Sequence, residues 1–246
     1  MRVEQQPAYV LHARAWRETS LLLEAFTRDH GRVGLVARGV RGTRSRLSRG
    51  LLQPLQPLLL DWVARGELGT LAGADAASAP IRLNGDALLA AMYVNELVLR
   101  LSVRGDSHAR AFAAYADCLA RLADGPIAWV LRRFERDFLA ELGYGLPLET
   151  RADGEPVREG ETYAYDVEAG PIPPLPDDPR PRVDGASLLA LADDCMPDPN
   201  GLAQLRRVMR HVLRHHLGGD LQAWRLAAPR GAASAETAAR PPRDIE

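Results

Sequence analysis

The sequence predicts an α+β fold in which a small β-barrel is followed by an all-helical domain. Two patterns along the 246 residues predict it. Short runs of strand length, punctuated by turn residues, fill the chain before about residue 72, and after residue 80 apolar side chains recur every three or four positions. We therefore expect a barrel domain over residues 1–79 and a helical domain over residues 80–228. Residues 229–246, rich in alanine, arginine and proline, are expected to form a disordered tail.

Five runs of strand length make up the first part of the chain, and turn residues separate several of them. So many short strands in about 65 residues indicate a closed barrel, and the five-stranded OB barrel, a common nucleic-acid-binding fold, is the obvious candidate. A linker of small residues, Ala72–Pro80, is expected to follow the last run. The runs are Tyr9–Trp16, Ser20–Thr27, Gly31–Arg38, Leu55–Ala64 and Glu67–Leu71.

One wall of this barrel is expected to be basic. Successive side chains of a strand point to opposite faces, so Arg32 and Arg38 leave the third strand on the side opposite Leu35. In the first strand, Arg14 shares a face with Trp16. An aromatic ring beside such a wall can stack on a nucleic-acid base, as in many OB barrels. Burial of Trp16 in the barrel is the alternative, and the sequence does not decide between the two.

An arginine-rich loop extends this wall. The sequence VRGTRSRLSR between Gly39 and Gly50 contains no acidic residue. A solvated connector is one explanation for such a loop, but its place next to a basic strand favours contact with phosphates. The wall and the loop together give the predicted phosphate-binding residues Arg14, Arg32, Arg38, Arg41, Arg44, Arg46 and Arg49.

The charge of the whole chain hides an asymmetry between its two parts. The net charge is −1, yet residues 1–65 hold 11 arginines against 5 acidic residues. The remainder holds 20 arginines against 27 acidic residues. A basic N-terminal part predicts a polyanionic partner for that part alone.

The helical pattern is interrupted once. Apolar stripes at helical spacing predict three helices up to Leu142, and Gly143 and Gly145 end the third of them. An acidic, proline-rich insertion follows at about residues 147–184, irregular apart from a possible short strand at Glu161–Asp166. Two further helices are expected, over residues 186–192 and 202–217.

Sequence motifs for catalysis are missing. The chain has no Walker A, GxSxG, HExxH or GxGxxG motif, so we expect no enzymatic activity and no cofactor. His211 and His215 share a helix face, but no further metal ligand is near them in sequence, and we expect no metal site. Two cysteines, no apolar run of membrane-spanning length and no signal-peptide core predict a reduced, cytoplasmic protein, without a membrane partner.

Several stretches resemble the RecO family of bacterial recombination mediators, in the family's order and over roughly residues 7–224. The first and fourth are long and specific. They are RETSLLLEAFTRDHGRVGLVARGVRG (17–42), LLQPLQPLLLDWVARGELGTL (51–71), NELVLRL (95–101), LRRFERDFLAELGYGL (131–146) and HLGG (216–219).

The resemblance implies an OB barrel followed by helices, and a protein of DNA repair and recombination without enzymatic activity. It implies binding of single- and double-stranded DNA, annealing of complementary strands, and a nucleoid-associated location. It also implies two protein partners, RecR and the acidic C-terminal tail of single-stranded DNA-binding protein, with which such proteins load recombinase onto coated DNA. An RNA-binding or translation-associated OB module is the alternative function.

Two departures from the family pattern limit this transfer. Many relatives carry a four-cysteine zinc module after the LGYGL stretch, whereas the segment after Leu148 has no cysteine quartet. Zinc is therefore not expected. After the paired glycines, a PLKSR-like stretch is replaced by residues 220–225, DLQAWR, so part of a basic contact is lost.

The third predicted helix is the expected receptor for the tail. A ligand with carboxylates and an apolar end needs a hydrophobic pocket rimmed by arginine, and Phe134, Phe138 and Leu142 form an apolar stripe there. Complete burial of that stripe in the core is the alternative. The C-terminal helix, with Arg206, Arg207 and Arg210, is the second place for the tail. The predicted tail-binding residues are Arg132, Arg133 and Arg136.

Overall fold

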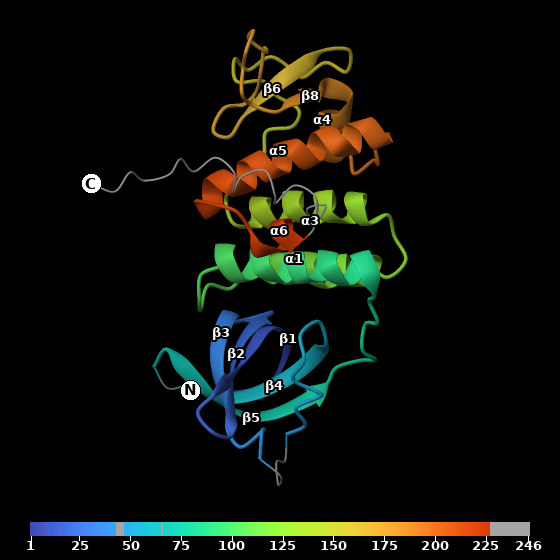
Figure 1. Ribbon diagram of the computed structural model, residues 1–246. Helices are drawn as coiled ribbons and strands as arrows, with labels where there is room; N and C mark the ends of the chain where they lie inside the picture. Colours follow the sequence, from blue (N-terminus) through green and yellow to red (C-terminus); the bar gives the residue numbers. More distant parts are fainter. Residues whose placement is uncertain (43–46, 65, 227–246) are drawn as a thin grey trace, which may run out of the picture.

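A computed structural model describes residues 1–42, 47–64 and 66–226. The predicted tail at 229–246 lies outside these ranges, as do Arg44 and Arg46. Figure 1 shows a layered molecule: the barrel at one end, a group of helices across it, the long helix α5 beyond them, and a small sheet at the far end.

The first layer is a closed barrel with the strand order β1-β2-β3-β5-β4, which confirms the predicted fold class. Only β3 and β5 pair in parallel; the other neighbours are antiparallel. Alternating buried residues such as Leu21, Leu23, Leu35 and Leu60 fill its interior. The strands are β1 (Arg2–Trp16), β2 (Ser20–Thr27), β3 (Gly31–Ala37), β4 (Pro57–Val63) and β5 (Leu68–Ala76).

Two strands are longer than the sequence predicts. β1 begins at Arg2 rather than Tyr9, and its early residues pair with the end of β4, as in Val3 with Trp62. β5 continues to Ala76, so the first half of the expected linker belongs to the barrel and pairs with β4. Both extensions close the barrel through partners far away in sequence, which a local alternation pattern does not show.

Within the described residues, the helical part contains the five expected helices, a small sheet and one short further helix, α6. The insertion is more regular than predicted, because the expected strand near Glu161–Asp166 is joined by two short strands in the order β7-β6-β8. Tyr163, Tyr165 and Val183 of this sheet are buried in the helical core. The elements are α1 (Gly85–Leu101), α2 (Ala109–Arg121), α3 (Ile127–Glu141), β6 (Thr162–Asp166), β7 (Gly170–Ile172), β8 (Arg182–Asp184), α4 (Gly185–Ala192), α5 (Pro199–Leu217) and α6 (Gln222–Leu226).

Aromatic rings join the barrel to the helices. Tyr9 and Phe26, on the outside of β1 and β2, both pack against Phe112 and Tyr115 of α2, with ring centroids 5.0–5.7 Å apart. The Tyr115 hydroxyl donates to the side-chain oxygen of Asn95 (2.6 Å), and the Asn95 amide donates to the Leu11 carbonyl oxygen (3.1 Å). These polar groups are satisfied inside the junction, so the contact specifies one docking geometry.

A glycine allows a second close contact between the barrel and the helical part. Gly31 opens β3 with φ +60°, and a Cβ there would lie 1.9 Å from the Asp106 carbonyl oxygen. The residue therefore needs both the left-handed conformation and the missing side chain. The Gly105 amide donates to the Arg32 carbonyl oxygen at 3.0 Å beside it. One end of the β1–β2–β3 wall is thus covered by the helical part.

Candidate nucleic-acid interface and partner groove

The other end of the β1–β2–β3 wall is basic and uncovered. Register places Arg14 opposite Leu22, and Leu22 opposite Val36, on one outer face. Arg38 follows Val36 by two residues, so it continues that face, and both arginines are exposed. The predicted alternation is therefore present in the structure at this end.

The start of the arginine loop folds onto the same end. The Arg41 backbone amide donates to the Thr19 carbonyl oxygen (2.9 Å), and its guanidinium lies 3.4 Å from the Arg17 carbonyl oxygen, in the turn between β1 and β2. Arg17 lies in a turn, at φ +52°, so the alternation along the strands does not predict its position. We call the following set the basic end of the barrel: Arg14, Trp16, Arg17, Arg38 and Arg41.

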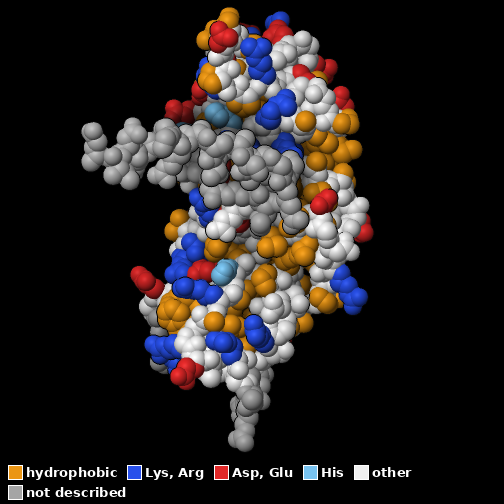
Figure 2. All heavy atoms as spheres, in the orientation of Figure 1, with side chains coloured by type: hydrophobic (Ala, Val, Ile, Leu, Met, Phe, Trp, Pro, Cys, Tyr) orange, Lys and Arg blue, Asp and Glu red, His pale blue; other side chains and the backbone are white. Residues whose placement is uncertain are grey.

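The arginines of the basic end lack acidic partners. Within the part of the chain that the structure describes, none of the four pairs with a carboxylate. Figure 2 shows arginine side chains (blue) recurring over the barrel, in the lower half of the view. Arg49, in the same loop, is exposed as well. Unpaired guanidinium groups of this kind can bind phosphates without first breaking an ion pair.

Trp16 is neither fully buried nor free. It is partly exposed and belongs to neither buried hydrophobic cluster, and the Arg14 guanidinium carbon lies 5.6 Å from its ring centroid. The ring thus lies at the basic end rather than in the barrel interior, where a partly exposed aromatic ring can stack on a base.

Arg32 does not belong to the basic end, contrary to the sequence prediction. Its guanidinium donates to Glu24 at 2.8 Å and to the Ser102 carbonyl oxygen at 3.0 Å, and Arg104 contacts the same carboxylate. Only 18% of the Arg32 side chain is exposed. The alternation placed it on the correct face, but the helical part covers that end of the face, so Arg32 holds the two parts together.

A shallow groove lies between α2 and α3. Its floor includes the buried side chains of Cys118, Val130 and Phe134, and arginines stand at its edge. We call it the α2–α3 groove; it is lined by Ala114, Asp117, Cys118, Arg121, Val130, Arg133, Phe134 and Asp137.

Arg132 is not on the edge of this groove, and its prediction as a rim residue is wrong. The side chain is buried beside Glu135, whose carboxylate accepts from its Nε at 2.6 Å and from a second guanidinium nitrogen. The Tyr93 hydroxyl donates to the same carboxylate, and burial, together with that charge, raises the pKa of Tyr93. Phe138 is also buried and stacks on Phe134 at 5.2 Å, so the apolar stripe belongs to the core.

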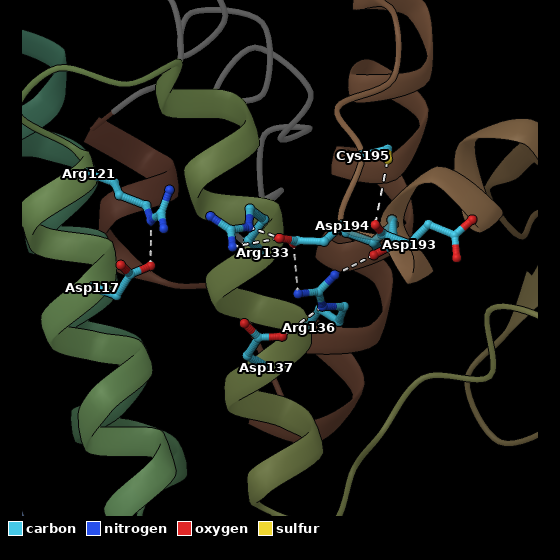
Figure 3. A network of polar contacts seen from close by, with 9 residues as sticks. Asp117, Arg121, Arg133, Arg136, Asp137, Asp193, Asp194 and Cys195 are labelled. Atoms are coloured by element: carbon cyan, nitrogen blue, oxygen red, sulfur yellow. Dashed lines mark hydrogen bonds and ion pairs between the residues drawn. The ribbon is translucent and has the colours of Figure 1, made fainter.

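Arg133 and Arg136 remain near the groove but are neutralised. Both contact the Asp194 carboxylate, at 2.6 and 3.1 Å for the closest atoms, and Arg136 also pairs with Asp137 (Figure 3). Arg121, which the sequence did not single out, pairs with Asp117 at 2.6 Å one turn earlier on α2. In the sequence, an Asp-Arg pair at i,i+4 spacing looks like part of an ordinary solvated helix surface, so it gives no sign of a groove there.

The histidines near the end of α5 pack against neighbouring side chains. The His216 ring stacks on Tyr144, with the ring centroids 4.3 Å apart. Burial, and to a smaller extent the charge of the neighbouring His215, lowers the pKa of His216. Burial also lowers the pKa of His211. In residues 1–42, 47–64 and 66–226, no three side chains of metal-binding type gather in one place. Nor does any helix in these ranges combine the length and apolar character needed to cross a membrane.

Comparison with known proteins gives the same family for both parts. The family model described as Recombination protein O N terminal matches residues 1–80, and the one described as Recombination protein O C terminal matches residues 82–225. The protein named DNA repair protein RecO in Xanthomonas euvesicatoria pv. vesicatoria (strain 85-10) is 47% identical over 232 residues, covering 92% of this chain and 97% of the relative. Its namesake in Aromatoleum aromaticum is 45% identical over 221 residues, covering 89% and 92%.

A third relative extends this agreement. DNA repair protein RecO of Stenotrophomonas maltophilia (strain R551-3) is 44% identical over 231 residues, covering 92% of this chain and 97% of the relative. Two matched models span almost the whole described chain, and the relatives are matched over more than nine-tenths of their own length. The chain therefore belongs to the RecO family of DNA repair proteins.

Proposed function

We propose that this protein is a recombination mediator that binds single- and double-stranded DNA without sequence preference and anneals complementary strands. Together with RecR it would load recombinase onto DNA coated by single-stranded DNA-binding protein, in the cytoplasm and at the nucleoid. No catalytic step is part of this proposal. Membership of a DNA repair family favours it over an RNA-binding module.

The observation that carries the proposal is the basic end of the barrel. Arg14, Arg17, Arg38 and Arg41 face solvent around Trp16, with no carboxylate partner among the described residues. Such groups bind phosphates and release counterions, which gives affinity but no sequence preference. A strand held through its phosphates, with one base on Trp16, leaves its other bases free to pair.

The second part of the proposal concerns the tail of single-stranded DNA-binding protein. We place its binding site at the α2–α3 groove, since Ala114 gives its lining a partly exposed apolar surface, which suits an apolar end. Arg121 and Arg133 at the edge suit the carboxylates. Arg133 and Arg136 stay among the proposed tail-binding residues, and Arg132 is left out because it is buried.

Annealing of coated DNA tests the proposal. Complementary strands are covered with single-stranded DNA-binding protein and mixed with this protein, and duplex formation is followed by fluorescence energy transfer. We expect the protein to accelerate annealing of the coated strands, and RecR to be required for recombinase loading. A protein that binds RNA but does not pair coated DNA strands would refute the proposal.

A further inference from the structure

An internal carboxylate occupies the arginines that the proposed tail site needs. Asp194 lies in the turn between α4 and α5, and its two carboxylate oxygens accept from Arg133 Nε at 2.6 Å and from Arg133 Nη2 at 2.7 Å. Arg136 Nη2 donates to the same carboxylate at 3.1 Å (Figure 3). This two-pronged geometry is the one in which arginine binds a carboxylate ligand.

The backbone of the turn after α4 fixes the position of Asp194. Asp193 ends α4, and Asp194 follows in the left-handed conformation at φ +57°. Glycine is the residue most often found at this position after a helix, because it has no Cβ to clash. The turn is fixed from behind by the Cys195 amide, which donates to the Ala190 carbonyl oxygen at 2.8 Å. Aspartate is among the few other residues that tolerate this conformation, so the turn can hold the Asp194 side chain beside the arginines.

The turn also has the chemistry of the proposed ligand. Its sequence, Asp193-Asp194-Cys195-Met196-Pro197, sets two acidic residues before an apolar one, and Met196 is 55% exposed. An acidic tail with an apolar end has the same order of groups. Because 44% of the Asp194 side chain is exposed, solvent weakens its ion pair, and an incoming carboxylate can replace it.

We propose that the α4–α5 turn is an internal competitor of the tail, in which Asp194 holds Arg133 and Arg136 until the tail carboxylates displace it. This inference rests on the proposed tail site and adds its regulation. Exchange of one carboxylate for another keeps the arginines neutralised in both states. The groove is then selective for ligands that supply an apolar end as well as charge, since charge alone gains nothing over Asp194.

Two substitutions of Asp194 test this. Asp194→Asn removes the charge at constant size, and Asp194→Gly removes the side chain from a position where glycine is favoured. We expect both to bind a fluorescently labelled tail peptide roughly three- to fivefold more tightly than the natural chain, the gain expected from removing a partly exposed ion pair. The gain should vanish when Arg133→Ala is added.

Asp193→Asn is the matched control. It removes one negative charge from the neighbouring position of the same turn, where the carboxylate contacts no arginine within the described residues. Equal tightening by Asp193→Asn would mean that the net charge of the turn matters and not the contact, and this would overturn the inference. Unchanged or weaker binding by the Asp194 variants, with weaker binding by Arg133→Ala, would also overturn it while leaving the tail site standing.

A measurement on the natural chain covers the case in which the variants fold poorly. Cys195 is exposed and Cys118 is buried, so a fluorophore can be attached beside Asp194 alone. Saturating tail peptide should lower the anisotropy of this fluorophore as the turn is released. Constant anisotropy at saturation would refute displacement, whereas absence of any peptide binding would refute the tail site itself.

Discussion

The arginines of two surfaces are in opposite states. At the basic end of the barrel, Arg14, Arg38 and Arg41 lack carboxylate partners among the described residues, whereas Arg121 and Arg133 at the α2–α3 groove are each paired with an aspartate. A phosphate backbone can therefore bind the first surface by releasing mobile counterions alone. A carboxylate ligand of the second surface must first displace a fixed one. We therefore expect the same residue type to give ready, unselective binding in one place and conditional binding in the other.

Arg132, which is buried beside Glu135, should matter for stability rather than for ligand binding. Arg132→Ala would leave the buried Glu135 carboxylate without its cation, and breaking such a pair typically costs about 3–5 kcal/mol. We expect the free energy of unfolding, measured in urea, to fall by about this amount. Arg133→Ala, at a partly exposed ion pair, should change it by about 1 kcal/mol or less. A stable Arg132→Ala protein that binds DNA normally and has lost only tail binding would return Arg132 to the ligand site.

Charge reversal at the basic end should have the largest effect on DNA binding. Each lost phosphate contact flattens the dependence of log affinity on log salt by about 0.7–0.9, so Arg14→Glu, Arg38→Glu and Arg41→Glu together should flatten it by about two or more. At about 0.1 M salt this corresponds to a loss of affinity of roughly a hundredfold, similar for unrelated sequences. Fluorescence anisotropy across a salt series measures both quantities.

A second triple variant serves as the control for total charge. Arg82, Arg206 and Arg207 are exposed and have no carboxylate partner within the described part of the chain, but they lie outside the barrel. Reversing these three to glutamate changes the net charge equally and should leave most of the DNA affinity. Equal losses in the two variants would show that DNA responds to overall charge, and the comparison between the two surfaces would fail.

Removal of the groove arginines should act on the tail and not on DNA. Arg121→Ala with Arg133→Ala should weaken binding of a tail peptide roughly tenfold, because charge-assisted hydrogen bonds to a carboxylate are lost. DNA affinity should stay the same, since these arginines are already neutralised. Arg206→Ala with Arg207→Ala is the control on α5, and a larger loss in that variant would move the tail site to the C-terminal helix.

The sequence predicts these two surfaces unequally well, and the reason is physical. Alternation along a strand correctly places Arg14, Arg32 and Arg38 on one face, because that depends only on local backbone geometry. It does not show what covers the face, so the pattern also assigns Arg32 to DNA, although Glu24 and the Ser102 carbonyl oxygen hold its side chain. The strand extensions at Arg2 and Ala76 depend on distant partners, so the alternation does not predict them either.

Prediction was less reliable on the helices. Arg132 and Arg133 are neighbours in sequence, yet one is buried and the other reaches the groove edge, because successive helical residues point about 100° apart. The apolar stripe with arginines beside it does not decide which of them faces inward. Asp194 lies about sixty residues from Arg133, and no local pattern connects the two.

The smallest expected effect comes from a paired arginine far from both surfaces. In the insertion, hydrogen bonds from the Arg180 side chain and backbone lower the pKa of Asp178 from 3.8 to about 2. A carboxylate with a lowered pKa stabilises the fold fully above its ordinary pKa, and this contribution is lost as the pH falls toward 2. Asp178→Asn should therefore lower the melting temperature slightly at pH 7, and the difference from the natural chain should shrink between about pH 4 and pH 2.

Asp177→Asn changes the same charge one residue earlier, where no hydrogen bond to Arg180 exists, and should show no such convergence. A difference that persists unchanged down to pH 2 would mean that it does not come from the Asp178 charge. Because Arg180 also pairs with Asp166, equal stability of the two proteins at every pH would mean that Asp166 alone holds the arginine in place.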